Sequence, residues 1–290
     1  MSDKNFITDP SSWKDITPDM YDEINAQIEQ TFDEGCHGQC SSCESGCDDK
    51  LPVFAKKLYT VTGGKGGTGK STVTVLLACA LARKGLRVGV LDCDLPGSTI
   101  PQLMGLNDRV MSENEVMSPV VTPEGLEVIS MNLIAADRSE PVLWAGVDTF
   151  NVVNYLYTGT NWGKLDVMLL DMPSGAADVP LNLYTSFPVD GSIIVTEPGS
   201  IPYVPTQRTI HLCSMLMNKP VAYIENRAMS AAPVSAGQYE LPPACLKVAL
   251  PLDPELMARA EEGDLPSYSA PALDPVVELI ASAAAGKKEQ

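Results

Sequence analysis

The chain has 290 residues, 44% of them apolar, which suffices for the core of one large domain or two small ones. Lys and Arg number 20 against 37 Asp and Glu, and the net charge of −17 disfavours nucleic acid and anionic membranes as partners. No apolar run approaches the ~20 residues that span a bilayer, and the start, MSDKNFITDP, lacks the features of a signal peptide. We therefore expect a cytoplasmic protein, whose eight cysteines are not expected to form disulfides.

Residues 1–50 are polar and acidic, and we expect them to form an extension in front of one domain over residues 51–290. Apolar side chains recur at every fourth position from Met20 to Phe32, which predicts a short amphipathic helix. The segment GCHGQCSSCESGC follows and spells C-x₃-C-x₂-C-x₃-C through Cys36, Cys40, Cys43 and Cys47.

Four thiolates in so short a glycine-rich loop favour wrapping a [4Fe–4S] cluster. Structural zinc usually takes two C-x₂-C pairs separated by a longer loop, although zinc and redox-active thiols stay open as alternatives. The first three cysteines also have the radical-SAM spacing, but Cys47 offers a fourth ligand and the chain that follows is not a barrel. His37 is interpreted as a solvated turn residue.

From residue 57 onward, short apolar runs alternate with helical stretches. Strands are predicted at 57–62, 86–92, 126–132, 166–172, 191–197, 220–226 and 246–252, and helices at 70–85, 147–157, 206–218 and 253–263. Unbroken apolar strands separated by helices predict an α/β fold: a doubly wound, mostly parallel sheet with helices on both faces. Cys79, Cys213, Met215 and Met217 are interpreted as packing residues, whereas the roles of Cys93 and Cys245 stay open.

Residues 64–71, GKGGTGKS, fit G-x-x-x-x-G-K-[ST] between a predicted strand and a predicted helix. Backbone N–H groups of such a loop surround phosphate oxygens; Lys70 would bridge the β- and γ-phosphates, and Ser71 would bind Mg²⁺. The same residues also match the dinucleotide pattern G-x-G-x-x-G, which gives Lys70 and Ser71 no role. The predicted nucleotide-binding residues are Gly64, Lys65, Gly66, Gly67, Thr68, Gly69, Lys70, Ser71 and Thr72.

Three aspartates follow predicted strands. Asp171 ends the run DVMLLD, and Asp92 and Asp94 lie in LDCDLPGS. A lone aspartate at a strand end often caps a turn or helix, but three such side chains at one sheet edge beside a phosphate loop favour a functional site. We expect Asp171 to hold Mg²⁺ through water, and Asp92 and Asp94 to orient the attacking water; Asp92 is also assigned to Mg²⁺.

These motifs resemble known families. Lys65 in GGKGGTGKST resembles the signature lysine of the class that includes MinD, ParA and the nitrogenase iron protein, which implies that Lys65 contacts nucleotide across a homodimer interface. From about Lys56 to Pro266, the segments LDCDLPGSTIPQLMGL, PVLWAG, LDVMLLDMPSGAADVPLNL, GSIIVTEPGS, VAYIEN and LPLDPELMARAEEGDLP resemble the Mrp/ApbC iron–sulfur carrier ATPases. That resemblance implies that Asp94 lies in the first switch, that DMPSGAAD is the second, and that Asn226 faces adenine.

The resemblance implies an ATP-hydrolysing homodimer that delivers an iron–sulfur cluster to apo-proteins. The C-x-x-C pair that the family usually carries after the EN segment is missing, and only Cys245 lies in that region, so a symmetric dimer would bring two thiolates rather than four. One alternative is an ATP-driven electron donor to a redox partner, like the nitrogenase iron protein. Another is a ParA- or MinD-like positioning module, which the acidic charge disfavours.

Overall fold

The computed structural model describes residues 51–113, 116–135, 147–176, 178–216 and 218–286. The predicted amphipathic helix and the four clustered cysteines lie outside these residues. Among the helices that are described, none has both the length and the apolar character needed to cross a lipid bilayer.

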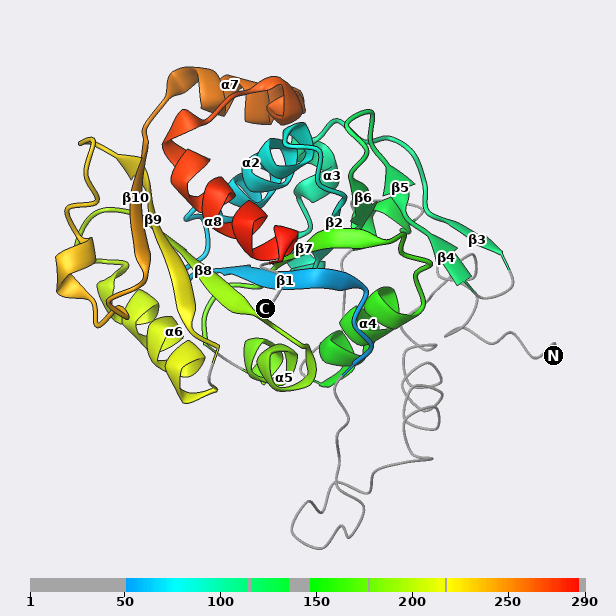
Figure 1. The fold of residues 1–290 in the computed structure, drawn as a ribbon, viewed down its shortest axis with the longest axis horizontal. Helices are drawn as coiled ribbons and strands as arrows, with labels where there is room; N and C mark the ends of the chain where they lie inside the picture. Colours follow the sequence, from blue (N-terminus) through cyan, green and yellow to red (C-terminus); the bar gives the residue numbers. More distant parts are fainter. Residues whose placement is uncertain (1–50, 114–115, 136–146, 177, 217, 287–290) are drawn as a thin grey trace, which may run out of the picture.

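An eight-stranded sheet runs through the centre of the molecule in the order β10-β9-β8-β1-β7-β2-β6-β5 (Figure 1). Neighbouring strands are parallel, except that β5 runs antiparallel to β6. All seven predicted strands are present, whereas β5 and the separate β3–β4 hairpin were not predicted. The strands are β1 (Ala55–Thr62), β2 (Val88–Asp92), β3 (Met111–Glu113), β4 (Val116–Ser118), β5 (Val120–Val121), β6 (Glu127–Ile129), β7 (Leu165–Asp171), β8 (Gly191–Thr196), β9 (Pro220–Ala228) and β10 (Leu246–Pro251).

Helices cover both faces of the sheet: α2, α3, α7 and α8 lie on one side, and α4, α5 and α6 on the other (Figure 1). This arrangement confirms the predicted doubly wound α/β class. The four predicted helices are present, but α3, α5 and α8 were not predicted. The helices are α2 (Lys70–Arg83), α3 (Ile100–Leu103), α4 (Val147–Thr158), α5 (Asp178–Ser186), α6 (Tyr203–Met215), α7 (Pro254–Glu262) and α8 (Asp274–Ala285), with short 3₁₀ turns at Leu95–Gly97, Met131–Leu133, Ala236–Gln238, Leu265–Ser267 and Pro271–Leu273.

Each face of the sheet has its own hydrophobic core, because parallel strands buried on both sides direct alternate side chains to opposite layers. Cys79 packs in one core and Cys213 in the other, as predicted. The prediction that Met215 packs is wrong, since its side chain is 79% exposed. The buried stripe of α6 runs through Thr206, Thr209, Ile210 and Cys213, and Met215 falls outside that stripe. Met217 lies outside the described residues.

The carboxyl ends of the central strands meet at one edge of the sheet. Val61 near the end of β1 is in register with Asp171 at the end of β7, and Asp171 is in register with Asp92 at the end of β2. The loop that follows β1 starts at the same edge, so the strand order brings the predicted phosphate loop and two of the predicted acids together.

Candidate active site

The predicted phosphate loop occupies residues 63–69, between the end of β1 and the first turn of α2 at Lys70. Thr68 is fully buried and Lys70 is only 6% exposed, whereas Lys65 lies on the exposed side of the loop. The N-terminus of α2 follows directly, and its free N–H groups and dipole favour an anion at this point. The loop is therefore built to hold phosphate.

Gly69 caps α2 in a left-handed conformation, with φ of 87°. A Cβ atom at this position would lie 2.2 Å from Nδ2 of Asn226. Asn226 comes from the end of β9, and its Nδ2 donates a 2.8 Å hydrogen bond to the Thr68 carbonyl. The glycine is thus required twice: by its backbone angle and by the close approach of a side chain that holds the loop.

Asp171 lies behind the loop and is almost fully buried, with 1% exposure. Its Oδ1 accepts a 2.9 Å hydrogen bond from the Thr74 hydroxyl on α2, and Ser71 also donates to the carboxylate. Burial raises the pKa of Asp171 to about 6, against the lowering effects of Ser71, Thr74 and Lys70. Oδ2 has no hydrogen-bond partner among the described residues.

The unpartnered Oδ2 of Asp171 shows whether the residues of this site fit Mg²⁺. A buried carboxylate oxygen without a partner is costly, and a hard cation with water ligands beside the Ser71 hydroxyl would satisfy it. The residues present fit the ion: Ser71 and Asp171 would hold it, and Mg²⁺ would neutralise charge on the phosphate oxygens. Thr74 was not predicted from the sequence, although it lies on the same helix face as Ser71, three residues later.

Asp92 has no exposed surface, and both of its oxygens accept hydrogen bonds. The Ser130 hydroxyl donates to Oδ2 over 2.9 Å, and the Asp94 backbone N–H donates to Oδ1 over 3.2 Å. Burial, and then the charge of Asp171, raise the pKa of Asp92. The predicted Mg²⁺ role of Asp92 stays a prediction; in this structure the side chain ties β2 to Ser130 after β6 and to the segment that carries Asp94.

Asp94 and the phosphate loop both line a cavity of about 430 Å³. Partial burial raises the pKa of Asp94, while nearby Lys70 lowers it. The segment from Asp94 onward is closed by hydrogen bonds from Gly97 N (2.9 Å) and Ser98 Oγ (3.3 Å) to the Asp94 carbonyl. The cavity is lined by Gly66, Gly67, Gly69, Lys70, Ser71, Thr72, Asp94, Gly97, Thr99, Gln102, Leu103, Arg227, Ala260 and Glu261.

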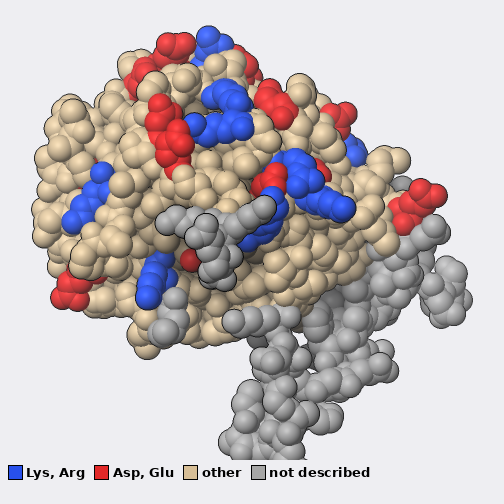
Figure 2. Space-filling view, in the orientation of Figure 1, with Lys and Arg blue, Asp and Glu red and all other residues tan. Residues whose placement is uncertain are grey.

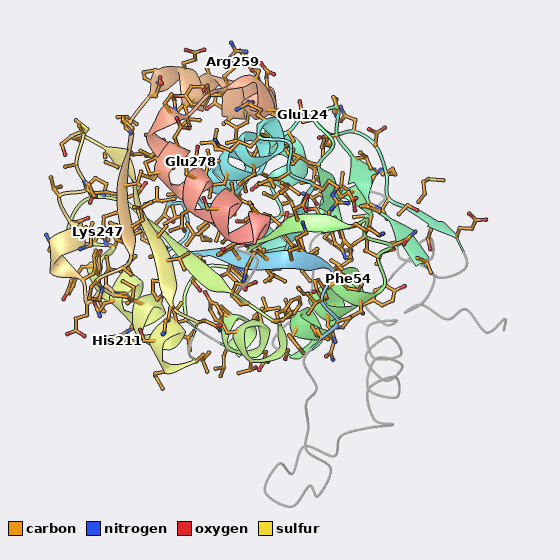
Figure 3. The ribbon with its side chains drawn as sticks, viewed as in Figure 1. Phe54, Glu124, His211, Lys247, Arg259 and Glu278 are labelled. Atoms are coloured by element: carbon orange, nitrogen blue, oxygen red, sulfur yellow. The ribbon has the colours of Figure 1, made fainter. Side chains whose placement is uncertain are left out.

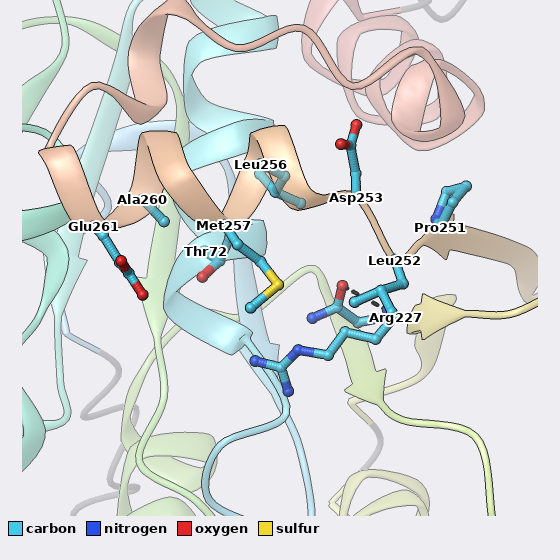
Figure 4. A pocket seen from close by; sticks show the side chains of 10 residues that line it. Thr72, Arg227, Pro251, Leu252, Asp253, Leu256, Met257, Ala260 and Glu261 are labelled. Carbon is cyan, nitrogen blue, oxygen red and sulfur yellow. Dashed lines mark hydrogen bonds between the residues drawn. The ribbon is translucent and has the colours of Figure 1, made fainter.

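A second cavity of about 180 Å³ adjoins the first, with Thr72, Arg227, Ala260 and Glu261 common to both linings. In Figure 4 Met257 points from α7 toward Arg227, and Leu252 and Pro251 form the opposite wall. Asn226 lines this cavity, as expected for a residue beside a nucleobase, but its amide already bonds the Thr68 carbonyl and accepts from the Arg227 N–H over 2.9 Å. Contact between Asn226 and adenine therefore stays a prediction.

Arg227 is a site residue that the sequence analysis missed. Its φ of 55° is a left-handed angle that costs a residue with a side chain about 1 kcal/mol or more. The guanidinium Nη1 donates 2.9 Å to the Gly67 carbonyl and forms an ion pair with Glu197 at the end of β8. Arg227 and Asn226 together hold the phosphate loop from β9. The only signal for Arg227 in the sequence was its position directly after the predicted strand at 220–226.

Cysteines of the described residues do not assemble a metal site, and within these residues no group of three or more potential metal ligands occurs. Cys245 is buried, and burial raises the pKa of its thiol to about 11, so the thiolate that binds iron is disfavoured. Cys93 is fully buried between Asp92 and Asp94, and burial raises its pKa as well. The predicted ligands Cys36, Cys40, Cys43 and Cys47 lie outside the described residues.

Comparison with known proteins agrees with this geometry. Residues 55–242 match the ParA-type family described as NUBPL iron-transfer P-loop NTPase. An "iron-sulfur cluster carrier protein" of Clostridium perfringens is 34% identical over 220 residues, spanning 65% of this chain and 78% of that protein. A protein of the same name from Methanocaldococcus jannaschii is 34% identical over 215 residues, or 68% and 74% of the two chains. A nucleotide-binding protein from Archaeoglobus fulgidus, solved with ADP, superposes with a TM-score of 0.64 at 26% identity, covering 76% of this chain and 92% of that one.

The fold and the phosphate loop define a P-loop ATPase of the MinD/ParA class. Within that class, the chain belongs to the family of NUBPL-type iron-transfer P-loop NTPases, and the family resemblance seen in its sequence is confirmed.

Proposed function

We propose that the protein is an iron–sulfur cluster carrier, in which ATP binding and hydrolysis control how a cluster is held and then delivered to apo-protein clients. The observation that carries the proposal is that residues 55–242, which match an iron-transfer family, are the residues that build the phosphate loop and its acidic partners. The relatives from Clostridium perfringens and Methanocaldococcus jannaschii are named as carriers of iron–sulfur clusters, which supports a cluster as the transferred group.

In this proposal the buried Lys70 ammonium neutralises the β- and γ-phosphates, and Ser71 and Asp171 hold Mg²⁺. The Asp94 carboxyl, which lines the same cavity as Lys70, orients the attacking water. The base occupies the cavity between Asn226 and Met257, because this cavity adjoins the phosphate cavity and has an apolar wall.

The working unit in this proposal is a homodimer that ATP tightens. Lys65 supports the homodimer, because its side chain is exposed on the phosphate loop. From there it would reach nucleotide that is bound to the second subunit. Sedimentation with ADP and with a non-hydrolysable ATP analogue tests the point. A monomer that still hydrolyses ATP at the wild-type rate would contradict the dimer.

The cluster in this proposal is a [4Fe–4S] group on Cys36, Cys40, Cys43 and Cys47, handed to clients in the cytoplasm. No group of three or more potential metal ligands surrounds Cys245 among the described residues, which supports assigning the cluster to the N-terminal cysteines rather than to this thiol. On the face shown in Figure 2, Lys and Arg side chains are interleaved with Asp and Glu, which supports a protein client over nucleic acid.

The decisive experiment is anaerobic iron and sulfide analysis, followed by transfer to an apo iron–sulfur protein. Wild-type protein should carry about four iron and four sulfide per chain. Replacing Cys36, Cys40, Cys43 and Cys47 together by Ser should remove that iron while ATP binding survives, because the body around the sheet has its own cores. Cys245→Ser serves as the matched control and should keep both iron and transfer.

Other outcomes select the alternatives. One zinc ion without labile sulfide would contradict the carrier. Iron that stays bound while electrons pass to a redox partner would identify an electron donor instead. ATP-dependent binding to DNA or vesicles without bound iron would identify a positioning ATPase.

A further inference from the structure

The short segment that precedes β1 is fastened to the ends of two helices. The Leu51 N–H donates a 3.3 Å hydrogen bond to the Ser186 carbonyl, which belongs to the last residue of α5. The Tyr157 hydroxyl on α4 donates 2.7 Å to the Pro52 carbonyl. The Phe54 ring meets the Tyr157 ring edge-on at 4.9 Å, and Tyr157 in turn packs at 4.7 Å against Phe187. We call residues 51–54 with these contacts the anchor.

The anchor lies at the opposite edge of the sheet from the phosphate loop. β1 begins at Ala55, directly after the anchor, and reaches the loop after Thr62; eight residues of strand place these ends ~23 Å apart. Figure 3 shows Phe54 beside α4, at the end of the sheet where β1 starts. Covalent geometry limits Cys47, four residues before Leu51, to within ~14 Å of it.

The other end of α5 starts at the nucleotide site. The segment between β7 and α5 contacts the phosphate loop, since the Gly175 N–H donates 3.0 Å to the Gly63 carbonyl. The Ser174 hydroxyl would lie 3.8 Å from a Cβ atom on Gly66. This segment follows Asp171 directly and leads into α5 at Asp178. The segment that contacts the phosphate loop and the nine residues of α5, ~13 Å long, therefore lie in succession between the loop and the anchor.

Between its two ends, α5 is held on the sheet by buried side chains that include Leu183 and Tyr184, and Tyr184 also makes polar contacts there. The Tyr184 hydroxyl lies 3.3 Å from Thr60 Oγ1 on β1, 3.5 Å from Ser192 Oγ on β8 and 3.4 Å from Cys213 Sγ on α6. The Asn218 side chain donates 3.1 Å to the Tyr184 carbonyl. Tyr184 lies two residues before Ser186, so a shift of α5 that changes the Tyr184 contacts also changes the hydrogen bond between Ser186 and Leu51.

We propose that α5 carries the nucleotide state from the phosphate loop to the anchor, the segment that separates the N-terminal cysteines from β1 in the sequence. The meaning of this coupling for cluster delivery rests on the proposed function, but the coupling itself requires only bound nucleotide. The contacts with the phosphate loop come from the segment just before α5, and the anchor contacts come from its last residue and from Phe187 after it, which connects the two sites through one element.

The test uses the full-length chain labelled with ¹⁵N-leucine, with the Leu51 amide resonance assigned by its loss in Leu51→Ile. Hydrogen exchange of this amide is measured with ADP and with a non-hydrolysable ATP analogue. We expect the two exchange rates to differ by about fivefold, the lower end of coupling between linked sites. The same difference is expected in the chain with Cys36, Cys40, Cys43 and Cys47 replaced by Ser, which separates this proposal from the presence of a cluster.

Tyr157→Phe tests the anchor with little change in packing, because only the hydroxyl bonded to Pro52 is lost. We expect faster Leu51 exchange in both states, a smaller difference between them, and by linkage a changed ratio of the dissociation constants for ADP and analogue. Tyr223→Phe is the matched control: it loses a 2.8 Å hydrogen bond to Ser235, away from α5, and should keep the wild-type difference. Equal Leu51 exchange with both nucleotides in wild-type protein, or an unchanged difference in Tyr157→Phe, would overturn the proposal.

Discussion

Thr74 and Asp171 face each other between α2 and β7, and the 2.9 Å hydrogen bond between them occupies one carboxylate oxygen while the other has no partner among the described residues. The sequence separates the two residues by 97 positions. This hydrogen bond fixes the orientation of the buried Asp171 carboxylate: Oδ1 is bonded to Thr74 of α2, and Oδ2 is available to a cation beside Ser71.

Asp171→Asn should lower Mg²⁺-dependent ATP hydrolysis by at least about 100-fold, because the neutral amide cannot replace the carboxylate near the ion. Nucleotide binding without Mg²⁺ should persist, and titration calorimetry with and without the ion measures both effects. Thr74→Val should instead destabilise the fold by about 1–3 kcal/mol, since the buried Asp171 carboxylate then loses its 2.9 Å hydrogen bond from α2. Thr74→Ser keeps the hydroxyl and is the control; equal unfolding midpoints for the Val and Ser variants would contradict this role.

Lys70→Ala should abolish ATP hydrolysis, because the β- and γ-phosphates lose a buried counter-charge that water cannot supply. Steady-state phosphate release measures the change. Lys65→Ala is informative beside it: if Lys65 acts across a dimer interface, hydrolysis should fall while monomeric nucleotide binding stays. Turnover near the wild-type rate in Lys70→Ala would disprove the assignment of the phosphate loop.

Comparing Gly69→Ala with Gly85→Ala separates the effect of a strained backbone angle from the effect of a clash between the new Cβ atom and Asn226. Both glycines have left-handed angles, 87° and 82°, but a Cβ on Gly69 would meet Asn226 Nδ2 at 2.2 Å, whereas a Cβ on Gly85 would meet no atom within 4 Å. Gly85→Ala should cost about 1 kcal/mol of stability and leave nucleotide binding intact. Gly69→Ala should lose nucleotide binding as well, measured with a fluorescent ATP analogue. Equal nucleotide affinity in the two variants would show that the contact with Asn226 is unimportant.

Asp166 should make the fold sensitive to acid. Its carboxylate accepts from Arg87 Nε and Nη2 at 3.1 Å each and pairs with Lys56 Nζ at 2.8 Å, and hydrogen bonding to Arg87 lowers its pKa well below the usual range. A lowered pKa in the folded state stabilises the protein above the unfolded value of about 4, and this contribution is lost as the pH falls below it.

Asp166→Asn should therefore cost about 1 kcal/mol at neutral pH, a modest value because the Lys56 and Arg87 side chains are more than half exposed. The variant should also have a flatter dependence of unfolding free energy on pH between 5 and about 3, measured by urea denaturation. Glu278→Gln, which breaks an exposed pair with Lys84, is the control. If the unfolding free energy of Asp166→Asn depended on pH as steeply as that of the wild type, the stabilising role of the Asp166 carboxylate would be contradicted.

The sequence by itself determined the features that depend on neighbouring residues. The phosphate loop, the strands and the helix that opens at Lys70 follow from local spacing and from apolar runs, because backbone conformation and hydrophobic periodicity are properties of short segments. The three aspartates were found for the same reason, since each ends an apolar run.

Only the tertiary structure decided which distant residues meet at the site. Asn226 reaches Thr68 across 158 positions, and Arg227 reaches Gly67 across 160, because strand order places β9 near the phosphate loop and no local pattern encodes that order. The α5 helix was missed because its first residue, Asp178, also ends the expected switch segment and its nine residues, DVPLNLYTS, carry only a short apolar pattern. The hydrogen bond from the Leu51 N–H to the Ser186 carbonyl likewise depends on how the helix layer packs on the sheet. Local sequence patterns do not determine that packing.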